Sequence, residues 1–314
     1  MYDSLVVAIV CCLFIWHASL LISGVSVKNT LAPGEKLLPN DDDYLESSNE
    51  FFKLKLMKRP GSGSSSSSGF SCFLSIQWAS IFVTPTSEER TIWVAWLGES
   101  ESCDIPELIM EREGQLLIFA DRYFVVNHDQ QYPFVMNTTA TLLDTGNLVL
   151  RGGGRTLWQS FDHPTGNTWV PGMKLGIFGL KTPQQQQRCL TSWTSEENPS
   201  PGAFSFCVDP NNTKQLVAMR RGVVYWHSGV WNGNNFPFLQ LNSHLRYFSN
   251  HNETYFAWDW NLDMASASIT IYATGAIYAF VSGGRTFAIS ISETNINCDH
   301  YNDTNYSNEG CVVR

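Results

Sequence analysis

Charged residues are scarce in this sequence, and positive charge is scarcer than negative charge. Only 16% of the 314 residues are Asp, Glu, Lys or Arg, and the formal net charge is −9. A scattered acidic surface does not attract nucleic acid or an anionic membrane, so both classes of partner are excluded. Hydrophobic residues make up 43% of the chain, which predicts a folded globular protein rather than a disordered one.

The motifs of the common enzyme and metal sites are also absent from the sequence. No GxSxG, HExxH or GK[ST] sequence occurs, and the glycine-rich stretches at 152–154 and 282–285 are predicted to be turns. No cysteine pair has CxxC spacing, which argues against zinc. Ser160, Asp162 and His163 are neighbours in sequence rather than a placed catalytic group. We therefore predict no catalytic residue, no metal and no cofactor.

The first residues form the longest apolar segment of the chain. Residues 5–22 are mostly apolar, and small residues follow at Ser23 and Gly24. This pattern predicts a secretory signal peptide over residues 1–24. Asp3 stands where a positive charge is usual, and the apolar run approaches the length of a membrane span. An uncleaved membrane anchor is therefore the alternative.

The cysteines and glycosylation sequons fit an exported chain. Of eight cysteines, six remain if Cys11 and Cys12 leave with the leader, and an even number predicts disulfides without defining their connectivity. Asn-x-Ser/Thr sequons are used only in the secretory pathway. We therefore predict a secreted or extracellular glycoprotein. The later cysteines are Cys72, Cys103, Cys189, Cys207, Cys298 and Cys311, and the N-glycosylation sites are Asn137, Asn211, Asn252, Asn302 and Asn305.

Short β-patterned runs follow one another through the rest of the sequence, separated by turn residues. This spacing is typical of an all-β barrel, prism or sandwich. No amphipathic helix longer than a turn or two is expected outside the leader, and the Gly/Ser run at 61–69 is predicted to be a flexible loop. The β-patterned runs are 52–56, 73–78, 91–96, 115–120, 123–128, 140–144, 147–151, 156–158, 188–194, 203–209, 215–231, 255–260, 267–280 and 286–292.

One disulfide can be predicted from strand register. If 188–194 and 203–209 pair as an antiparallel hairpin folded about Asn198, facing residues have numbers that sum to 396, and Cys189 and Cys207 satisfy that sum. Opposed side chains in such a ladder lie close enough for a disulfide after a small local twist. A shift of one residue would instead place the two sulfur atoms on opposite faces.

Several longer stretches carry a family resemblance. LLDTGNLVLR, LWQSFDHPT, PGMKLG, LTSW, NPSPGAFSF and YWHSGVWNG occur in this order between residues 142 and 233, and TLAPGEKL, FFKLKL, FLSIQW and TIWVAW precede them. This series closely resembles plant S-locus glycoproteins and the ectodomains of G-type lectin S-receptor-like kinases. After about residue 255 the resemblance fades.

The resemblance implies a bulb-type lectin domain over residues 27–161, which in this family is a β-prism of three small sheets. A connecting segment at 162–200, a second β-rich S-locus glycoprotein domain at 201–297 and a truncated cysteine-containing tail at 298–314, with Cys298 and Cys311 as disulfide candidates, would follow. Receptor members continue into a membrane helix and a kinase. No kinase motif occurs here, so the chain is expected to be a secreted member or a truncated receptor ectodomain, located at the plasma membrane in the second case.

The mannose-binding pattern of bulb-type lectins, QxDxNxVxY, is largely lost. Aligned on GNLVL, its five places are Leu143, Thr145, Asn147, Val149 and Arg151, so only Asn147 and Val149 match. A site that loses most of its hydrogen-bonding groups loses most of its discrimination. We therefore expect a degenerate carbohydrate site at Asn147 and Val149.

The conspicuous aromatic residues and glycines are interpreted as scaffold. Large aromatic side chains dominate small β-cores, and glycine allows turns with positive φ. The predicted packing residues are Trp158, Phe161, Trp193, Trp226 and Trp231, and the predicted positive-φ glycines are Gly146, Gly172, Gly202 and Gly229.

The sequence thus indicates a recognition glycoprotein related to ectodomains used in pollen and self/non-self recognition. Its expected partner is an extracellular peptide or glycan, or a receptor ectodomain, and a homodimer or heterodimer is possible. A mannose-type lectin is the alternative, and a glycan hydrolase is a second alternative for which no convincing acid pair exists.

Overall fold

The structure, a computed structural model, confirms the all-β fold. It describes residues 28–40, 42–60, 70–78, 90–96, 106–120, 122–128, 135–195, 198–239, 245–258, 267–281 and 285–289. These residues form short β-strands and one 3-10 helix, η1 (Ser160–Asp162), and include no α-helix. No helix in these ranges is long and apolar enough to cross a membrane. The predicted leader at 1–24, the Gly/Ser loop at 61–69 and the tail at 298–314 lie outside the described residues.

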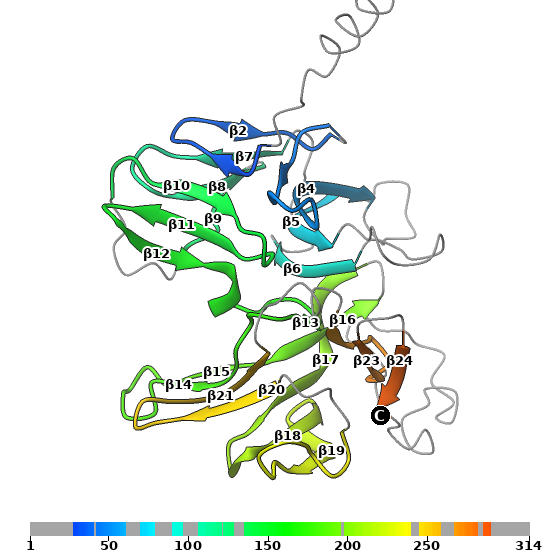
Figure 1. Cartoon of the computed structure of the whole chain (residues 1–314). Helices are drawn as coiled ribbons and strands as arrows, with labels where there is room; N and C mark the ends of the chain where they lie inside the picture. Colours follow the sequence, from blue (N-terminus) through cyan, green and yellow to red (C-terminus); the bar gives the residue numbers. More distant parts are fainter. Residues whose placement is uncertain are drawn as a thin grey trace, which may run out of the picture.

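Three antiparallel sheets of four strands each form the N-terminal half of the protein (Figure 1). The first three strands of the chain each join a different sheet as an edge strand, and three consecutive later strands complete each sheet. In sheet order, the strands are β1 (Thr30–Leu31), β10 (Thr139–Leu142), β11 (Leu148–Gly152) and β12 (Arg155–Gln159); β2 (Lys36–Leu37), β7 (Glu107–Met110), β8 (Leu116–Phe119) and β9 (Tyr123–Val125); and β3 (Leu45–Glu46), β4 (Phe52–Pro60), β5 (Phe70–Trp78) and β6 (Arg90–Trp96).

Alternating side chains explain why these strands pack as three sheets around one core. In β4, Phe52, Leu54 and Leu56 are buried, whereas Lys53 and Lys55 between them are half-buried on the other face. Successive side chains of a strand point to opposite faces, so this alternation directs one apolar face inward. The apolar faces of the three sheets meet and form the core.

The C-terminal half repeats the same number of sheets and strands, which the sequence did not predict. Three further four-stranded antiparallel sheets are present. In sheet order, their strands are β13 (Thr168–Trp169), β22 (Ser268–Ile271), β23 (Ile277–Val281) and β24 (Arg285–Ile289); β15 (Gln186–Arg188), β14 (Leu175–Phe178), β21 (Glu253–Trp258) and β20 (Leu245–Ser249); and β16 (Leu190–Ser195), β17 (Asn198–Asp209), β18 (Asn212–Arg220) and β19 (Val223–Val230).

The segment 162–200 is more than the connection that we expected. It supplies β13 to β16 and the beginning of β17 to the second set of sheets. The second set therefore begins at Thr168 rather than near residue 201. Strands of two to four residues carry too little periodicity to be recognised in the sequence, and β13 pairs with β22, about one hundred residues away.

The two sets of sheets meet at strand β6, which lies beside β13 and β17 at the centre of Figure 1. Trp93 of β6 donates its indole N–H to the carbonyl oxygen of His163 at 2.9 Å, and the Thr165 hydroxyl donates to the carbonyl of Val94. A Cβ atom at Gly166 would lie 2.4 Å from the carbonyl oxygen of Ile92. The two backbones therefore approach closely, and a single hydrophobic cluster includes residues of both halves.

An ion pair also joins the two halves. Arg188 of β15 contacts Asp162 of η1, with 2.6 Å between the guanidinium and a carboxylate oxygen. The guanidinium lies 3.8 Å from the centre of the Phe178 ring, and the Arg188 side chain is 14% exposed. Burial lowers the pKa of Arg188, whereas Asp162 raises it. The carboxylate therefore compensates a positive charge that has lost much of its hydration.

Asp162→Asn is expected to lower the free energy of unfolding by about 1–2 kcal/mol, because Arg188 keeps its charge but loses its anionic partner. Urea unfolding, followed by tryptophan fluorescence, measures the change. The matched control is Asp42→Asn, since Asp42 lies in an exposed turn and such a surface substitution should stay within about 0.5 kcal/mol. Equal stability of the two variants would contradict a structural role for the ion pair.

Candidate functional site

The residues predicted to form a degenerate carbohydrate site lie in or next to β11. A row of side chains crosses one face of the sheet that contains β11, because the strand register places Thr30 opposite Thr141, Thr141 opposite Val149, and Val149 opposite Gln159. The hydroxyls of Thr30 and Thr141 are 3.0 Å apart and hydrogen-bonded to each other. Val149 is only 2% exposed, so little of its surface can touch a ligand.

Asn147, the other residue that matches the mannose pattern, uses its side chain inside the protein. It directly precedes β11 and is 8% exposed. Its amide nitrogen donates to Gln159 Oε1 at 3.0 Å. Its Oδ1 atom accepts from the Ser160 hydroxyl at 3.1 Å and from the Phe161 backbone N–H at 3.2 Å. Because an amide oxygen has two lone pairs, these two bonds use its full acceptor capacity.

This geometry favours a structural role for Asn147, which links the start of β11 to helix η1. Of the three other places in the pattern, Leu143 and Thr145 are half-buried and Arg151 is exposed. Leucine cannot hydrogen-bond a sugar hydroxyl, and arginine can only donate. Carbohydrate binding at Asn147 and Val149 stays a prediction, and the described contacts offer it only one unused amide hydrogen of Asn147.

Most of the residues interpreted as scaffold are indeed packed. Trp158, Phe161 and Trp231 are 5%, 5% and 8% exposed, whereas Trp193 and Trp226 are half-buried. Gly146, Gly172 and Gly229 have positive φ, as expected. Gly202 does not; it lies inside β17, where a Cβ atom would come within 2.4 Å of the Trp193 carbonyl oxygen. Close approach of two strands, rather than a turn, requires that glycine.

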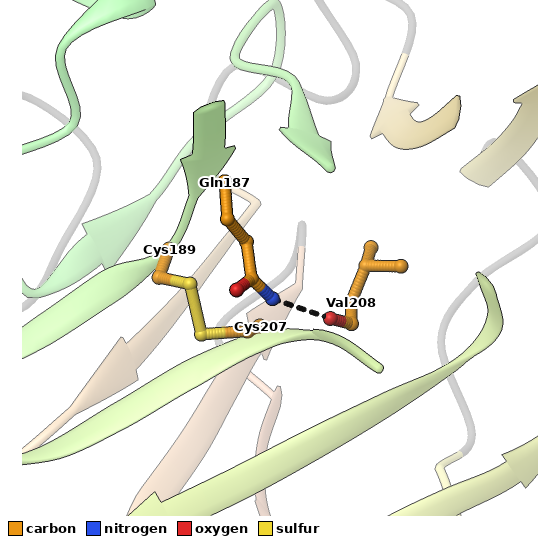
Figure 2. The surroundings of a disulfide bond; sticks show 4 residues. All are labelled: Gln187, Cys189, Cys207 and Val208. Atoms are coloured by element: carbon orange, nitrogen blue, oxygen red, sulfur yellow. Dashed lines mark hydrogen bonds between the residues drawn. A yellow bond between two sulfur atoms is a disulfide. The ribbon is translucent and has the colours of Figure 1, made fainter. Parts of the chain in front are cut away.

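The predicted disulfide between Cys189 and Cys207 is present (Figure 2), with an S–S distance of 2.06 Å. Beside it, Gln187 donates its side-chain amide to the carbonyl oxygen of Val208 at 2.7 Å, so a second link joins the same two segments. Cys72 is disulfide-bonded as well. The predicted candidates Cys298 and Cys311 lie outside the described residues.

Three of the five predicted N-glycosylation sites lie in the described part of the chain. Asn137, Asn211 and Asn252 are all exposed and lie in turns or bends between strands. This placement leaves room for an attached glycan, and glycosylation at these residues stays a prediction. Asn302 and Asn305 lie outside the described residues.

The described residues of the C-terminal half form a groove that sequence reasoning missed. Its volume is about 500 Å³, within the range of about 300–1,000 Å³ typical of small-molecule sites. It lies where the segment after β19 meets the start of β18 and strand β20, and we call it the Trp231 groove. The residues that line it are Lys214, Trp231, Asn232, Gly233, Leu245, Arg246 and Tyr247.

The Tyr247 hydroxyl at this groove is held by two threonines. It lies 2.9 Å from the Thr213 hydroxyl and accepts from the Thr254 hydroxyl at 3.0 Å. Burial by itself would raise the pKa of Tyr247, but hydrogen bonds with Thr213, Thr254 and Ser249, together with the charge of Lys214, hold the pKa below its usual value. No sequence pattern signals this cluster, because Lys214 and Tyr247 come from different sheets.

The described residues contain no arrangement that resembles a metal centre. No group of three or more His, Cys, Asp or Glu side chains within these ranges is placed to hold a metal ion. His163, which the sequence places beside Asp162, stacks on Trp158 with 5.5 Å between ring centres. Asp162 instead pairs with Arg188.

Comparison with known proteins finds similarity to lectin-type and S-locus proteins. The D-mannose binding lectin family matches residues 81–194. A G-type lectin S-receptor-like serine/threonine-protein kinase of Arabidopsis thaliana is 34% identical over 71% of this chain and 26% of its own length. An S-locus-specific glycoprotein of Brassica oleracea var. alboglabra is 30% identical over 70% of this chain and 48% of its own length. Among solved structures, a Marasmius oreades lectin covers 43% of this chain and 92% of its own, with 15% identity and a TM-score of 0.29.

Two sets of small antiparallel sheets with a degenerate sugar pattern define a lectin-like β protein. The chain carries a bulb-type lectin domain and is homologous, over much of its length, to plant G-type lectin S-receptor-like kinases and S-locus glycoproteins. It spans about a quarter of the length of the receptor kinase that it matches at 34% identity. The region matched in that kinase is its lectin-containing ectodomain, which is consistent with a non-enzymatic domain.

Proposed function

We propose that this protein is an extracellular recognition glycoprotein that binds a peptide, a glycan or a receptor ectodomain and performs no catalysis. The homology to S-locus glycoproteins and to receptor-kinase ectodomains supports this proposal. Its secretion or display at the plasma membrane, and a role in pollen or self/non-self recognition, are parts of the proposal. So are the predicted leader at residues 1–24, the glycans at Asn137, Asn211 and Asn252, and dimer formation.

The observation that carries the proposal is the internal use of Asn147. In a mannose-type lectin this residue would exchange hydrogen bonds with sugar hydroxyls, but here Gln159, Ser160 and Phe161 already occupy its side chain. Leu148, Val149 and Leu150 of the following strand are buried, whereas Leu143, Thr145 and Arg151 stand at three of the five places of the mannose pattern. A lectin-like scaffold without its usual sugar contacts suits recognition by another surface.

The test is a binding screen with the glycosylated full chain against mannose-terminated oligosaccharides and against plant cell-surface ectodomains. We expect saturable binding to an ectodomain or to a glycan without terminal mannose, and no binding to mannose probes at millimolar concentration. Mannose binding that is weakened by Arg151→Ala, but not by Arg112→Ala, would establish the lectin alternative. Arg112 is the control because it is exposed but lies near a different sheet. Release of reducing sugar from any glycan would contradict both binding functions.

A further inference from the structure

The Trp231 groove combines two positive side chains in an acidic protein. Lys214 lies near the start of β18 and Arg246 lies in β20, and both are exposed and line the groove. None of the described residues that line it is acidic, although the whole chain carries a net charge of −9. A local positive potential within an acidic surface attracts anionic groups to this place, and lysine and arginine bind carboxylates through charge-assisted hydrogen bonds.

The two aromatic residues of the groove, Trp231 and Tyr247, are held in place by packing against core phenylalanines. The Trp231 ring packs against Phe236 and Phe256, with ring centres 4.9 and 5.7 Å apart. The Tyr247 ring packs against Phe256 at 4.9 Å, and its hydroxyl is fixed by the two threonines. Binding a ligand here therefore needs little ordering of the Trp231 and Tyr247 side chains, which lowers that part of the entropic cost of association.

The polar groups near the aromatic rings are also positioned before binding. Asn232 accepts the backbone N–H groups of Asn234 and Asn235 at 2.9 Å each, which orients its side chain and directs the amide nitrogen away from those bonds. The backbone N–H of Trp231 donates to the carbonyl of Lys214 at 2.7 Å. This bond ties the Trp231 segment to β18 and places the lysine and the indole at the same site.

We propose that the Trp231 groove binds a saccharide unit that carries a carboxylate, and this inference rests on the proposed recognition function. Lys214 and Arg246 pair with the carboxylate. The half-buried Tyr247 ring provides a partly apolar surface for the C–H face of the sugar ring, because aromatic side chains with a polar edge suit ligands that are both apolar and hydroxylated. Trp231 is only 8% exposed and forms part of the groove wall. Asn232 supplies a hydrogen-bond donor for a hydroxyl group.

The test uses a linear trimer of galacturonic acid, with the uncharged galactose trimer of the same linkage as the matched probe. Isothermal titration calorimetry with the full chain should detect the acidic trimer and not the neutral one. Lys214→Gln and Arg246→Gln should each weaken binding about tenfold, the typical loss for one charge-assisted hydrogen bond. Lys181→Gln should leave the affinity unchanged, because Lys181 is exposed but does not line the groove.

Folding of each variant is checked by its thermal transition, and Lys214→Arg keeps the charge and should retain affinity within about threefold. Three results would overturn the inference: no binding of the acidic trimer at millimolar concentration, equal affinity for both trimers, or unchanged affinity in both glutamine variants. If the acidic trimer does not bind while an ectodomain still does, the groove assignment is wrong and the proposed recognition function stands. If neither binds, both fail.

Discussion

Replacing both Cys189 and Cys207 by alanine is expected to lower the free energy of unfolding by about 3 kcal/mol. The disulfide closes a loop with a sequence separation of 18 residues, and a cross-link of this length restricts the unfolded chain by roughly that amount. Cys207 is 1% exposed, so the removed sulfur also leaves a small buried space. The hydrogen bond from Gln187 to Val208 remains in the variant but holds the two segments less strongly.

Urea unfolding of the double variant and the unaltered protein measures this effect, and a larger m-value is expected because the unlinked unfolded chain exposes more surface. The control is Ser205→Ala, two residues before Cys207 in β17, which should change stability much less. Peptide mapping without reduction should recover a fragment that contains both cysteines. Detection of either cysteine as a free thiol in the native protein would show that this disulfide does not form.

Asn147→Ala is expected to cost about 3 kcal/mol of unfolding free energy, although Asn147 is one of the two residues that match a sugar-binding pattern. The substitution removes three hydrogen bonds and leaves the Phe161 N–H and the Ser160 hydroxyl without their acceptor. Ser160 and Phe161 are both buried, and each unsatisfied buried polar group costs about 1–3 kcal/mol. The Ser160 hydroxyl also accepts from the Leu148 N–H, so the loss reaches the first residue of β11.

The comparison that makes this prediction decisive is Asn234→Ala. Asn234 is exposed in the segment after β19, so its substitution should change the free energy of unfolding by less than about 0.5 kcal/mol. Chemical denaturation of both variants, together with titration of mannose, separates the two roles of Asn147. A stable Asn147→Ala variant that has lost measurable mannose binding would return Asn147 to the ligand site and refute its structural role.

The disulfide shows how far strand register can be predicted from sequence. The structure pairs Leu190 with Phe206, numbers that sum to 396 as predicted, but near the turn it pairs Ser195 with Asn198. Two register shifts within the ladder, between Thr191 and Trp193 and between Trp193 and Ser195, account for this change of pairing. The prediction that Cys189 and Cys207 face each other was therefore correct. The predicted hairpin lacked the two register shifts, because no local pattern marks where a β-bulge inserts an extra residue.

The division of the chain into sheets was harder to predict. Alternation in 52–56 and the apolar run in 203–209 are long enough to identify β4 and β17. Strand β13 has two residues and is a strand only because it pairs with β22. Whether such a short segment extends or turns depends on a partner that lies far away in sequence, so residues 162–187 could not be assigned from their own pattern.

The sequence by itself determined the all-β class, the resemblance to S-locus glycoproteins and lectin-type receptor ectodomains, and the loss of most of the mannose pattern. These properties depend on local periodicity and on motifs in a given order, which are visible in a linear chain. Only the tertiary structure decided that the Asn147 side chain hydrogen-bonds with Gln159, Ser160 and Phe161. It also decided that Lys214 and Arg246 line one groove. The physical reason is that side chains from different sheets meet only when the core closes, and no local pattern encodes that meeting.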